Sequence, residues 1–244
     1  MGRIINDIKC DIYAIECNAD DCELICEATE GRYARAEFTR SISVWLDKAA
    51  GKLVIKQRRG LLAKLFGSEA SVKIYVPGHM VPSLTAGGHR VDCTLCGGIY
   101  GDVEINPDSG SLSAESAAMN DCNVRAHIFD AKFADCTIKS GLICEVDEGD
   151  IAIENTFATV VACKTKKGNI GAAGLSCKNT AFDTAEGNIT ATICGDESTF
   201  DVWVNAREGT CNRQSANIEG NSASFKAHSA KGNIFADFVP CKED

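Results

Sequence analysis

The chain has 244 residues, of which 24% are charged and 45% are hydrophobic, a composition typical of a folded globular protein rather than a disordered one. The formal net charge of −9 argues against a nucleic-acid partner, because phosphate binding requires a basic face. No segment has the length of a membrane span, and the N-terminal MGRIINDIKCDIY lacks the apolar core of a signal peptide. We therefore expect a cytoplasmic protein; the alternative is a cell-surface protein whose export signal lies outside this sequence.

The N-terminal part of the chain contains strand-like segments joined by polar turns, without a glycine repeat. These segments are CDIYAIEC, CELICEATE, ARAEFTRSISVWLD and KLVIKQR. We interpret residues 1–70 as a small β-rich layer that caps or flanks a repeat domain formed by residues 71–244.

Helix is scarce, and its one candidate is RGLLAKLFGSEA, residues 59–70, in which four large apolar residues lie beside basic ones. It would contact a membrane surface or a partner, or else form a loop packed against the end of the repeat. We favour the loop, because so short an apolar stripe anchors weakly.

A glycine turn then recurs along the chain. The units Gly149-Asp150-Ile151, Gly168-Asn169-Ile170 and Gly187-Asn188-Ile189 follow one another at equal intervals. Because glycine is the natural residue for a turn with positive φ, we predict a structural turn at each repeat. The predicted turn glycines are Gly110, Gly149, Gly168, Gly187, Gly209 and Gly232.

On both sides of each glycine, apolar and polar residues alternate with the period of two that is typical of half-buried strands. Leu142 and Cys144 precede Gly149, for example, and Ile151 and Ile153 follow it. The interval between successive turns is too short for a repeat that contains a strand and a full helix. The pattern predicts an all-β fold, a single-stranded parallel β-solenoid (β-helix) of about eight short coils.

Fourteen cysteines fit this frame as small apolar residues of the interior. Cys122, Cys144, Cys163 and Cys211 occupy inward positions and are expected to be free thiols. Only Cys93 and Cys96 form a CxxC pair, and no second pair with matching spacing follows, so we predict no metal site. Whether any cysteine is reactive stays open.

Polar residues recur in register as well. Charges of opposite sign alternate before the glycine, as in Glu148, Lys167 and Glu186, which favours pairing across strands. Directly after the glycine come residues that could form a side-chain hydrogen-bond ladder: Asp150, Asn169, Asn188, Thr210 and Asn233. A structural role explains these residues better than a catalytic one.

The strand that ends in Val76 and Pro77, followed by repeated Gly-(Asp/Asn)-Ile turns, resembles a bacterial domain-of-unknown-function family labelled "putative adhesin". The resemblance covers residues 40–240 and implies a β-solenoid that acts by adhesion. The shared motifs are structural and carry no catalytic residues across. This chain departs from the family pattern in having Glu or Lys where Ser usually precedes the glycine, and in its many cysteines.

No catalytic constellation stands out. The four histidines fall in unrelated contexts, and the chain has no Ser-His-Asp order, phosphate-binding glycine loop or HExxH motif. We therefore predict a non-enzymatic binding or scaffold protein with no catalytic residues and no cofactor. The alternative is a carbohydrate-active β-helix enzyme or a lectin-like glycan binder.

One outward column is apolar, and an exposed apolar stripe usually has something covering it. We predict an interface there, with a protein or glycan partner or a second copy of the chain. Its residues are Ile143, Ala162, Ala181 and Trp203.

Overall fold

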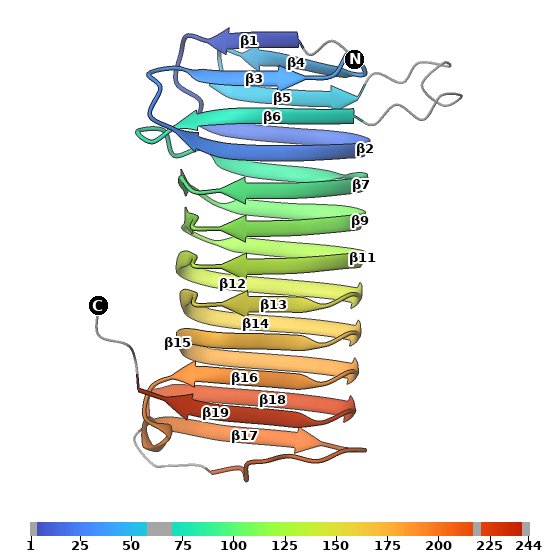
Figure 1. The fold of residues 1–244 in the computed structure, drawn as a ribbon, viewed down its shortest axis with the longest axis vertical. Helices are drawn as coiled ribbons and strands as arrows, with labels where there is room; N and C mark the ends of the chain where they lie inside the picture. Colours follow the sequence, from blue (N-terminus) through green and yellow to red (C-terminus); the bar gives the residue numbers. More distant parts are fainter. Residues whose placement is uncertain (1–3, 58–69, 217–220, 241–244) are drawn as a thin grey trace.

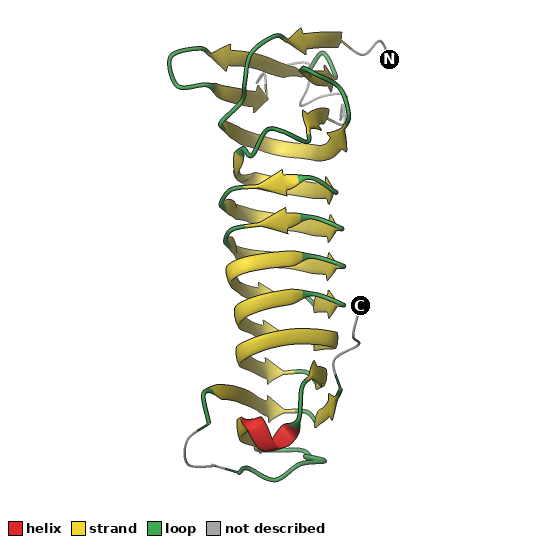
Figure 2. Cartoon of the chain, turned by 90° about the vertical axis from the view of Figure 1, so that its left-hand side faces the viewer, coloured by secondary structure: helices red, strands yellow, loops and turns green. Residues whose placement is uncertain are grey.

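The structure is a computed structural model that describes residues 4–57, 70–216 and 221–240. Within these ranges the chain is almost entirely β-strand, and its single helix is a three-residue 3-10 turn, Glu197–Thr199 (Figure 2). The predicted all-β fold class is therefore confirmed. No helix of the described ranges has the length and apolar character needed to cross a membrane. Most of the helical candidate at residues 59–70 lies outside the described residues, and its last residue, Ala70, begins a strand.

The middle of the molecule is a stack of parallel strands (Figure 1). Each strand pairs with the equivalent segment of the next repeat, so that Leu142 lies opposite Val161, and Val161 opposite Thr180. We call each such layer a rung. The strands of this part are β7 (Ser83–Cys96), β8 (Ile99–Tyr100), β9 (Val103–Glu115), β10 (Ala118–Met119), β11 (Cys122–Ala134), β12 (Thr137–Glu148), β13 (Ile151–Glu154), β14 (Phe157–Lys167), β15 (Ile170–Glu186) and β16 (Ile189–Cys194).

The core is one continuous column inside the stack. Alternation along each strand turns every second side chain inward, and the largest fully buried ones include Phe129, Phe133 and Phe182. Each such burial contributes roughly 1.5–3 kcal/mol of hydrophobic free energy. Between the large side chains lie small ones, among them Cys144 and Cys163, which stand opposite each other in neighbouring rungs.

At the N-terminal end the chain leaves its sequential order. β2 pairs in parallel with β7 on one side and with β5 and β6 on the other, so this early strand is a rung of the same stack. β3, β4 and β1 add antiparallel strands outside it. The hydrogen-bonded ladder thus has no break at the predicted boundary between residues 70 and 71. The strands are β1 (Ile4–Ile8), β2 (Ala14–Thr29), β3 (Ala34–Phe38), β4 (Ile42–Asp47), β5 (Lys52–Gln57) and β6 (Ala70–Pro77).

The C-terminal end is also out of sequential order. β18 (Ala223–Lys231) lies between β15 and β17 (Phe200–Ala206), and β19 (Ile234–Val239) pairs with β16 (Figure 1). The rung that carries Gly232 therefore follows that of Gly187, and the rung of Gly209 closes the stack. At this end the turns therefore do not stack in chain order.

Charge pairing favours the observed order of these last rungs over the chain order. In chain order, Glu186 and Glu208 would be direct neighbours, and like charges opposite each other on a sheet are destabilising. In the observed order Lys231 lies between them, with its Nζ 2.8 Å from Glu186 Oε1. The carboxylate of Glu186, with a smaller contribution from Glu208, raises the pKa of Lys231.

Candidate functional site

The turn glycines form a row along one edge of the stack. Gly110, Gly149, Gly168, Gly187 and Gly232 have φ values between +132° and +156°, whereas Gly209, in the terminal rung, has no such positive φ. A Cβ atom at any of the six would lie 1.9–2.1 Å from a backbone carbonyl oxygen of the adjacent rung. The row therefore determines how closely rungs approach, which is a structural role.

Beside the glycines runs a ladder of side-chain hydrogen bonds. The Oδ1 atom of Asn169 accepts from the backbone N–H of Asn188 at 3.0 Å, and Asn188 Oδ1 accepts from the N–H of Asn233 at 2.9 Å. In the same way, Asp150 Oδ1 accepts from the N–H of Asn169, and Asn233 Oδ1 accepts from the N–H of Thr210. The residues that sequence analysis selected for such a ladder do form it, in the spatial order of the rungs.

One exposed surface is formed by the outward side chains of residues 141–148, 160–167, 179–186 and 224–231, in β12, β14, β15 and β18. We call it the long face. The half of it nearest the turn glycines is a ladder of opposite charges: Lys164–Asp183 and His228–Asp183, with atom separations of 3.8 and 2.9 Å. Arg125 of the preceding strand, β11, extends the ladder to Glu145 at 3.4 Å. These charges are exposed and pair with one another, so this half of the face is electrically almost neutral.

Asp147 is held by two partners within this ladder. Lys166 Nζ lies 2.6 Å from Asp147 Oδ1, and His127 Nδ1 lies 2.8 Å from Oδ2. The Lys166 ammonium, followed by His127, lowers the pKa of the Asp147 carboxyl. Lys231 lowers the pKa of Glu186 in the same way.

We expect the protein to lose stability in acid, because protonation of these carboxyls removes the stabilising contribution of the pairs. A carboxyl whose pKa is lower in the folded than in the unfolded state stabilises the fold above the unfolded pKa, about 4, and that contribution is lost as the pH falls through the folded pKa. The melting temperature of the double variant Asp147→Asn/Glu186→Gln should therefore fall less between pH 5 and pH 3 than that of the parent chain. Equal falls in the two proteins would show that these pairs do not stabilise the fold.

The other half of the long face is apolar. Ile143 and Val160, which are 37% and 39% exposed, adjoin the small side chains of Ala162 and Ala181. We call these four residues the apolar patch. Trp203, the fourth member of the predicted column, is 47% exposed but lies beyond Lys226, which pairs with Ala181 on one side and Trp203 on the other. The structure thus brings together three of the four predicted interface residues and separates the fourth by one rung.

Three exposed lysines surround the apolar patch. Lys139 and Lys178 lie at its margin in β12 and β15, and Lys226 lies in the next rung. Within the described ranges, none of the three forms an ion pair, unlike Lys164 and Lys166 on the charged half of the face. The glycine repeat does not mark Lys139 and Lys178, because they lie further from the turn glycine than the repeated outward positions next to it. The signal that could have found them is their separation, which is close to twice the interval between turn glycines.

A second candidate is a groove of about 880 Å³ at the N-terminal end of the stack, between β1 and β4. Buried Ile8 and Leu53 and half-buried Val44 and Leu46 contribute its apolar lining, and its rim carries Lys9 and Lys48 together with Asp7 and Asp11. Its volume is in the range of small-molecule sites. The polar residues of the rim balance in charge and do not converge on one point of the lining.

The structure also bears on enzymatic chemistry. A shallow pocket of about 280 Å³ on the long face is lined by Glu145 and Asp147 together with Arg125, Lys164 and Lys166. A glycosidase needs one carboxyl with a raised pKa to act as general acid, whereas the pKa of Asp147 is lowered. Among the described residues, no group of three or more His, Cys, Asp or Glu side chains is arranged to hold a metal ion.

The cysteines are mostly buried. Cys122, Cys144 and Cys163 are at most 2% exposed, while Cys211 is half-buried, and the thirteen cysteines of the described ranges are all free. Burial raises the pKa of the Cys144 thiol to about 12. Because thiolates, not thiols, are the reactive species, Cys144 is poorly suited to be a nucleophile at neutral pH.

Comparison with known proteins connects this architecture to a family. Residues 35–244 match the family model described as Toastrack DUF4097. A crystal structure described as a putative adhesin from Bacteroides fragilis NCTC 9343 is similar, with 13% identity, a TM-score of 0.58, and 98% of this chain and 97% of that chain covered. Another, described as a putative lipid binding protein from Parabacteroides distasonis ATCC 8503, has 10% identity and a TM-score of 0.52, with 97% and 96% covered. At these identities the likeness concerns the fold. Curated proteins gave no match.

Proposed function

Because the chain belongs to the Toastrack DUF4097 family, we propose that it is a non-enzymatic binding or scaffold module of the adhesin type, built as a β-solenoid of about eight coils. The regular pairing of each strand with the equivalent segment of the next repeat supports the solenoid. A relative of the same fold is described as a putative adhesin, which supports a binding role at a cell surface.

The observation that carries this proposal is the interruption of the charge ladder by the apolar patch. Outward positions on the charged half of the long face pair charge with charge, yet the exposed Ile143, Val160 and Ala181 lie together around the half-buried Ala162. Charged residues are depleted at the centre of binding interfaces, where apolar side chains exclude water. The patch has that character, and its flank has the polar character of an interface rim.

The non-enzymatic part of the proposal is supported by the lowered pKa of Asp147 and by the ion pairs that engage Glu145 and Asp147. The alternative is a carbohydrate-active enzyme or a lectin-like glycan binder, which would use the same long face. Hydrolysis of a polysaccharide, lost in Glu145→Gln or Asp147→Asn, would establish that alternative.

Two alanines of β15 provide a matched test of the binding role. Ala181 lies in the apolar patch, and Ala185, further along the same face, lies in the charged half; both are exposed. In capture from extracts and on a glycan array, Ala181→Glu is expected to weaken binding at least tenfold, about 1.4 kcal/mol, while Ala185→Glu binds normally. Binding that both variants retain would show that the apolar patch is not the interface.

A further inference from the structure

We infer that the long face docks on an anionic lipid bilayer, with the apolar patch against the membrane and Lys139, Lys178 and Lys226 among the lipid headgroups. The inference rests on the proposed function, since it uses the same patch, and it adds the chemistry of the partner.

The first support is the local charge. The whole chain carries a net charge of −9, so attraction to an anionic surface has to come from a local group of cations. On the charged half of the long face the cations are neutralised, as Lys166 is by Asp147 and Lys164 by Asp183. Lys139, Lys178 and Lys226 have no such ion pairs among the described residues. Each lysine close to an anionic membrane adds to the attraction.

The second support is the composition of the surface between these lysines. From β12 to β18, the two outward rows on this half of the face hold no carboxylate: Gly141, Val160, Asn179 and Ser224 in one, and Ile143, Ala162, Ala181 and Lys226 in the other. In the next rung, β17, Trp203, which is 47% exposed, lies beyond Lys226, and Asp201 lies beyond Ser224. Tryptophan is enriched at the membrane–water interface, where its amphipathic ring lies at the headgroup level.

The third support is shape. The rungs of a sheet are about 4.8 Å apart, so Lys139 and Lys178, two rungs apart, are about 10 Å from each other along the stack. The lysines therefore surround the patch instead of converging on one point, and the small side chains of Ala162 and Ala181 form no deep pocket. The strands of this face also lie inside the stack, with neighbours on both sides, so a peptide cannot add to them as a further strand. A planar array of anionic headgroups fits these features better than a single acidic peptide.

Co-sedimentation with vesicles tests the charge. The full chain should bind vesicles of phosphatidylcholine with phosphatidylglycerol but not vesicles of phosphatidylcholine alone, and binding should weaken as salt is added. Lys178→Glu/Lys226→Glu should lower the partition coefficient at least tenfold. Lys9→Glu/Lys48→Glu makes the same change in net charge at the N-terminal groove, and its partition coefficient should stay within about twofold of that of the parent chain. Equal loss in both double variants, or equal binding to both kinds of vesicle, would overturn the inference.

Fluorescence tests the orientation, because the chain has two tryptophans, Trp45 and Trp203. In Trp45→Phe, Trp203 is the only tryptophan, and its emission should shift to the blue on anionic vesicles. In Trp203→Phe, the emission of Trp45, in the N-terminal strand β4, should not shift. A shift of Trp45 alone would place the bilayer at the other end of the molecule and overturn the inference.

The failure of this inference can be distinguished from the failure of the proposed function. If vesicles do not bind but Ala181→Glu still abolishes capture of a protein or glycan, the binding role stands and the bilayer is excluded. Salt-dependent binding of soluble polyglutamate in the absence of vesicle binding would show that the partner is an acidic protein. This result too would overturn the inference that the long face docks on a bilayer.

Discussion

Replacing Gly168 with alanine is expected to destabilise the protein by about 3 kcal/mol, through strain at positive φ and overpacking. Gly168 has a φ of +151°, and an added Cβ would lie 2.0 Å from the carbonyl oxygen of Gly149. The rungs cannot move apart easily, because that oxygen accepts a hydrogen bond from Thr165 and Gly168 N–H donates to the carbonyl of Glu186. Urea unfolding followed by circular dichroism would measure the loss.

Gly171 is the matched control, because it lies three residues after Gly168, in the strand β15 that follows the turn. The same substitution, glycine to alanine, applies there. Its φ is outside the positive range, and an added Cβ would have Ile151 O at 4.0 Å as its nearest neighbour. Gly171→Ala should therefore be neutral or stabilise the protein by up to about 1 kcal/mol. If the two variants unfold at the same urea concentration, close packing along the glycine row is not what determines the rung spacing.

The parts of the fold that the sequence predicts are those that repeat locally. The turn at Gly168 and the ladder position of Asn169 each depend on contacts that the same few residues make in every rung. Alternation along one strand places Cys144 and Cys163 inward whatever the order of the rungs. Local pattern is sufficient for these features because inward and outward positions follow from the pleat alone.

The order of the rungs at the two ends could not be predicted in the same way. Each rung has similar turn and strand residues, so the pattern around Gly209 and that around Gly232 fit either position. What distinguishes them is pairing between rungs, such as Lys231 with Glu186, and that contact spans 45 residues. At the other end, β2 forms a rung beside β7 although four strands, β3 to β6, separate them in sequence.

The candidate site follows the same division. The apolar residues Ile143, Ala162 and Ala181 share one column at the repeat spacing, and the sequence therefore finds them. Trp203 shares the column position but lies beyond Lys226, because β18 enters the stack between β15 and β17. The lysines around the patch become visible as a group only when strands and turns are placed in three dimensions.

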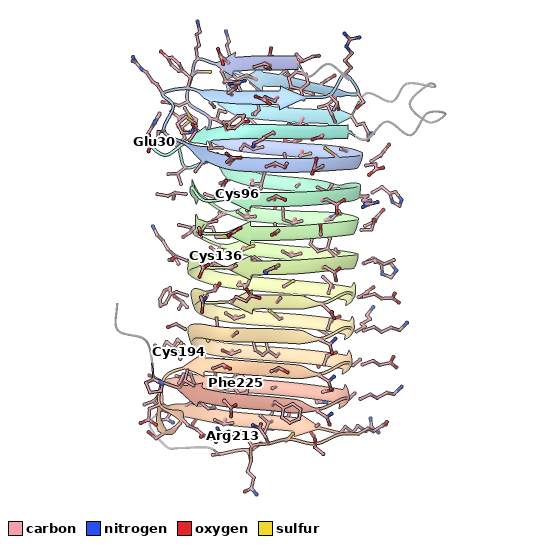
Figure 3. All side chains as sticks on the ribbon, in the orientation of Figure 1. Glu30, Cys96, Cys136, Cys194, Arg213 and Phe225 are labelled. Atoms are coloured by element: carbon pink, nitrogen blue, oxygen red, sulfur yellow. The ribbon has the colours of Figure 1, made fainter. Side chains whose placement is uncertain are left out.

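Phe225→Ala is expected to cost about 3–5 kcal/mol, the usual loss for truncating a fully buried phenylalanine. Phe225 belongs to the inserted strand β18 (Figure 3). Its side chain is 0% exposed. Its ring centroid lies 6.1 Å from that of Phe182 in β15, with the rings nearly perpendicular, and 5.8 Å from that of Phe238. Denaturant unfolding of the variant would measure the loss, and a value below about 1 kcal/mol would contradict burial of this strand.

A double-mutant cycle with these residues tests the order of the rungs as well as the burial. In the observed order Phe182 and Phe225 are neighbours, so Phe182→Leu and Phe225→Leu should be coupled by about 0.5–1.5 kcal/mol. Val202, in β17, is one rung further from Phe182 than Phe225 is, and Phe182→Leu with Val202→Ala should be additive within about 0.5 kcal/mol. Stacking in chain order would reverse these results, since β17 would then lie against β15. Coupling to Phe225 without coupling to Val202 would therefore establish that the chain forms β17 first and then inserts β18 between β15 and β17. The local repeat alone does not predict this order.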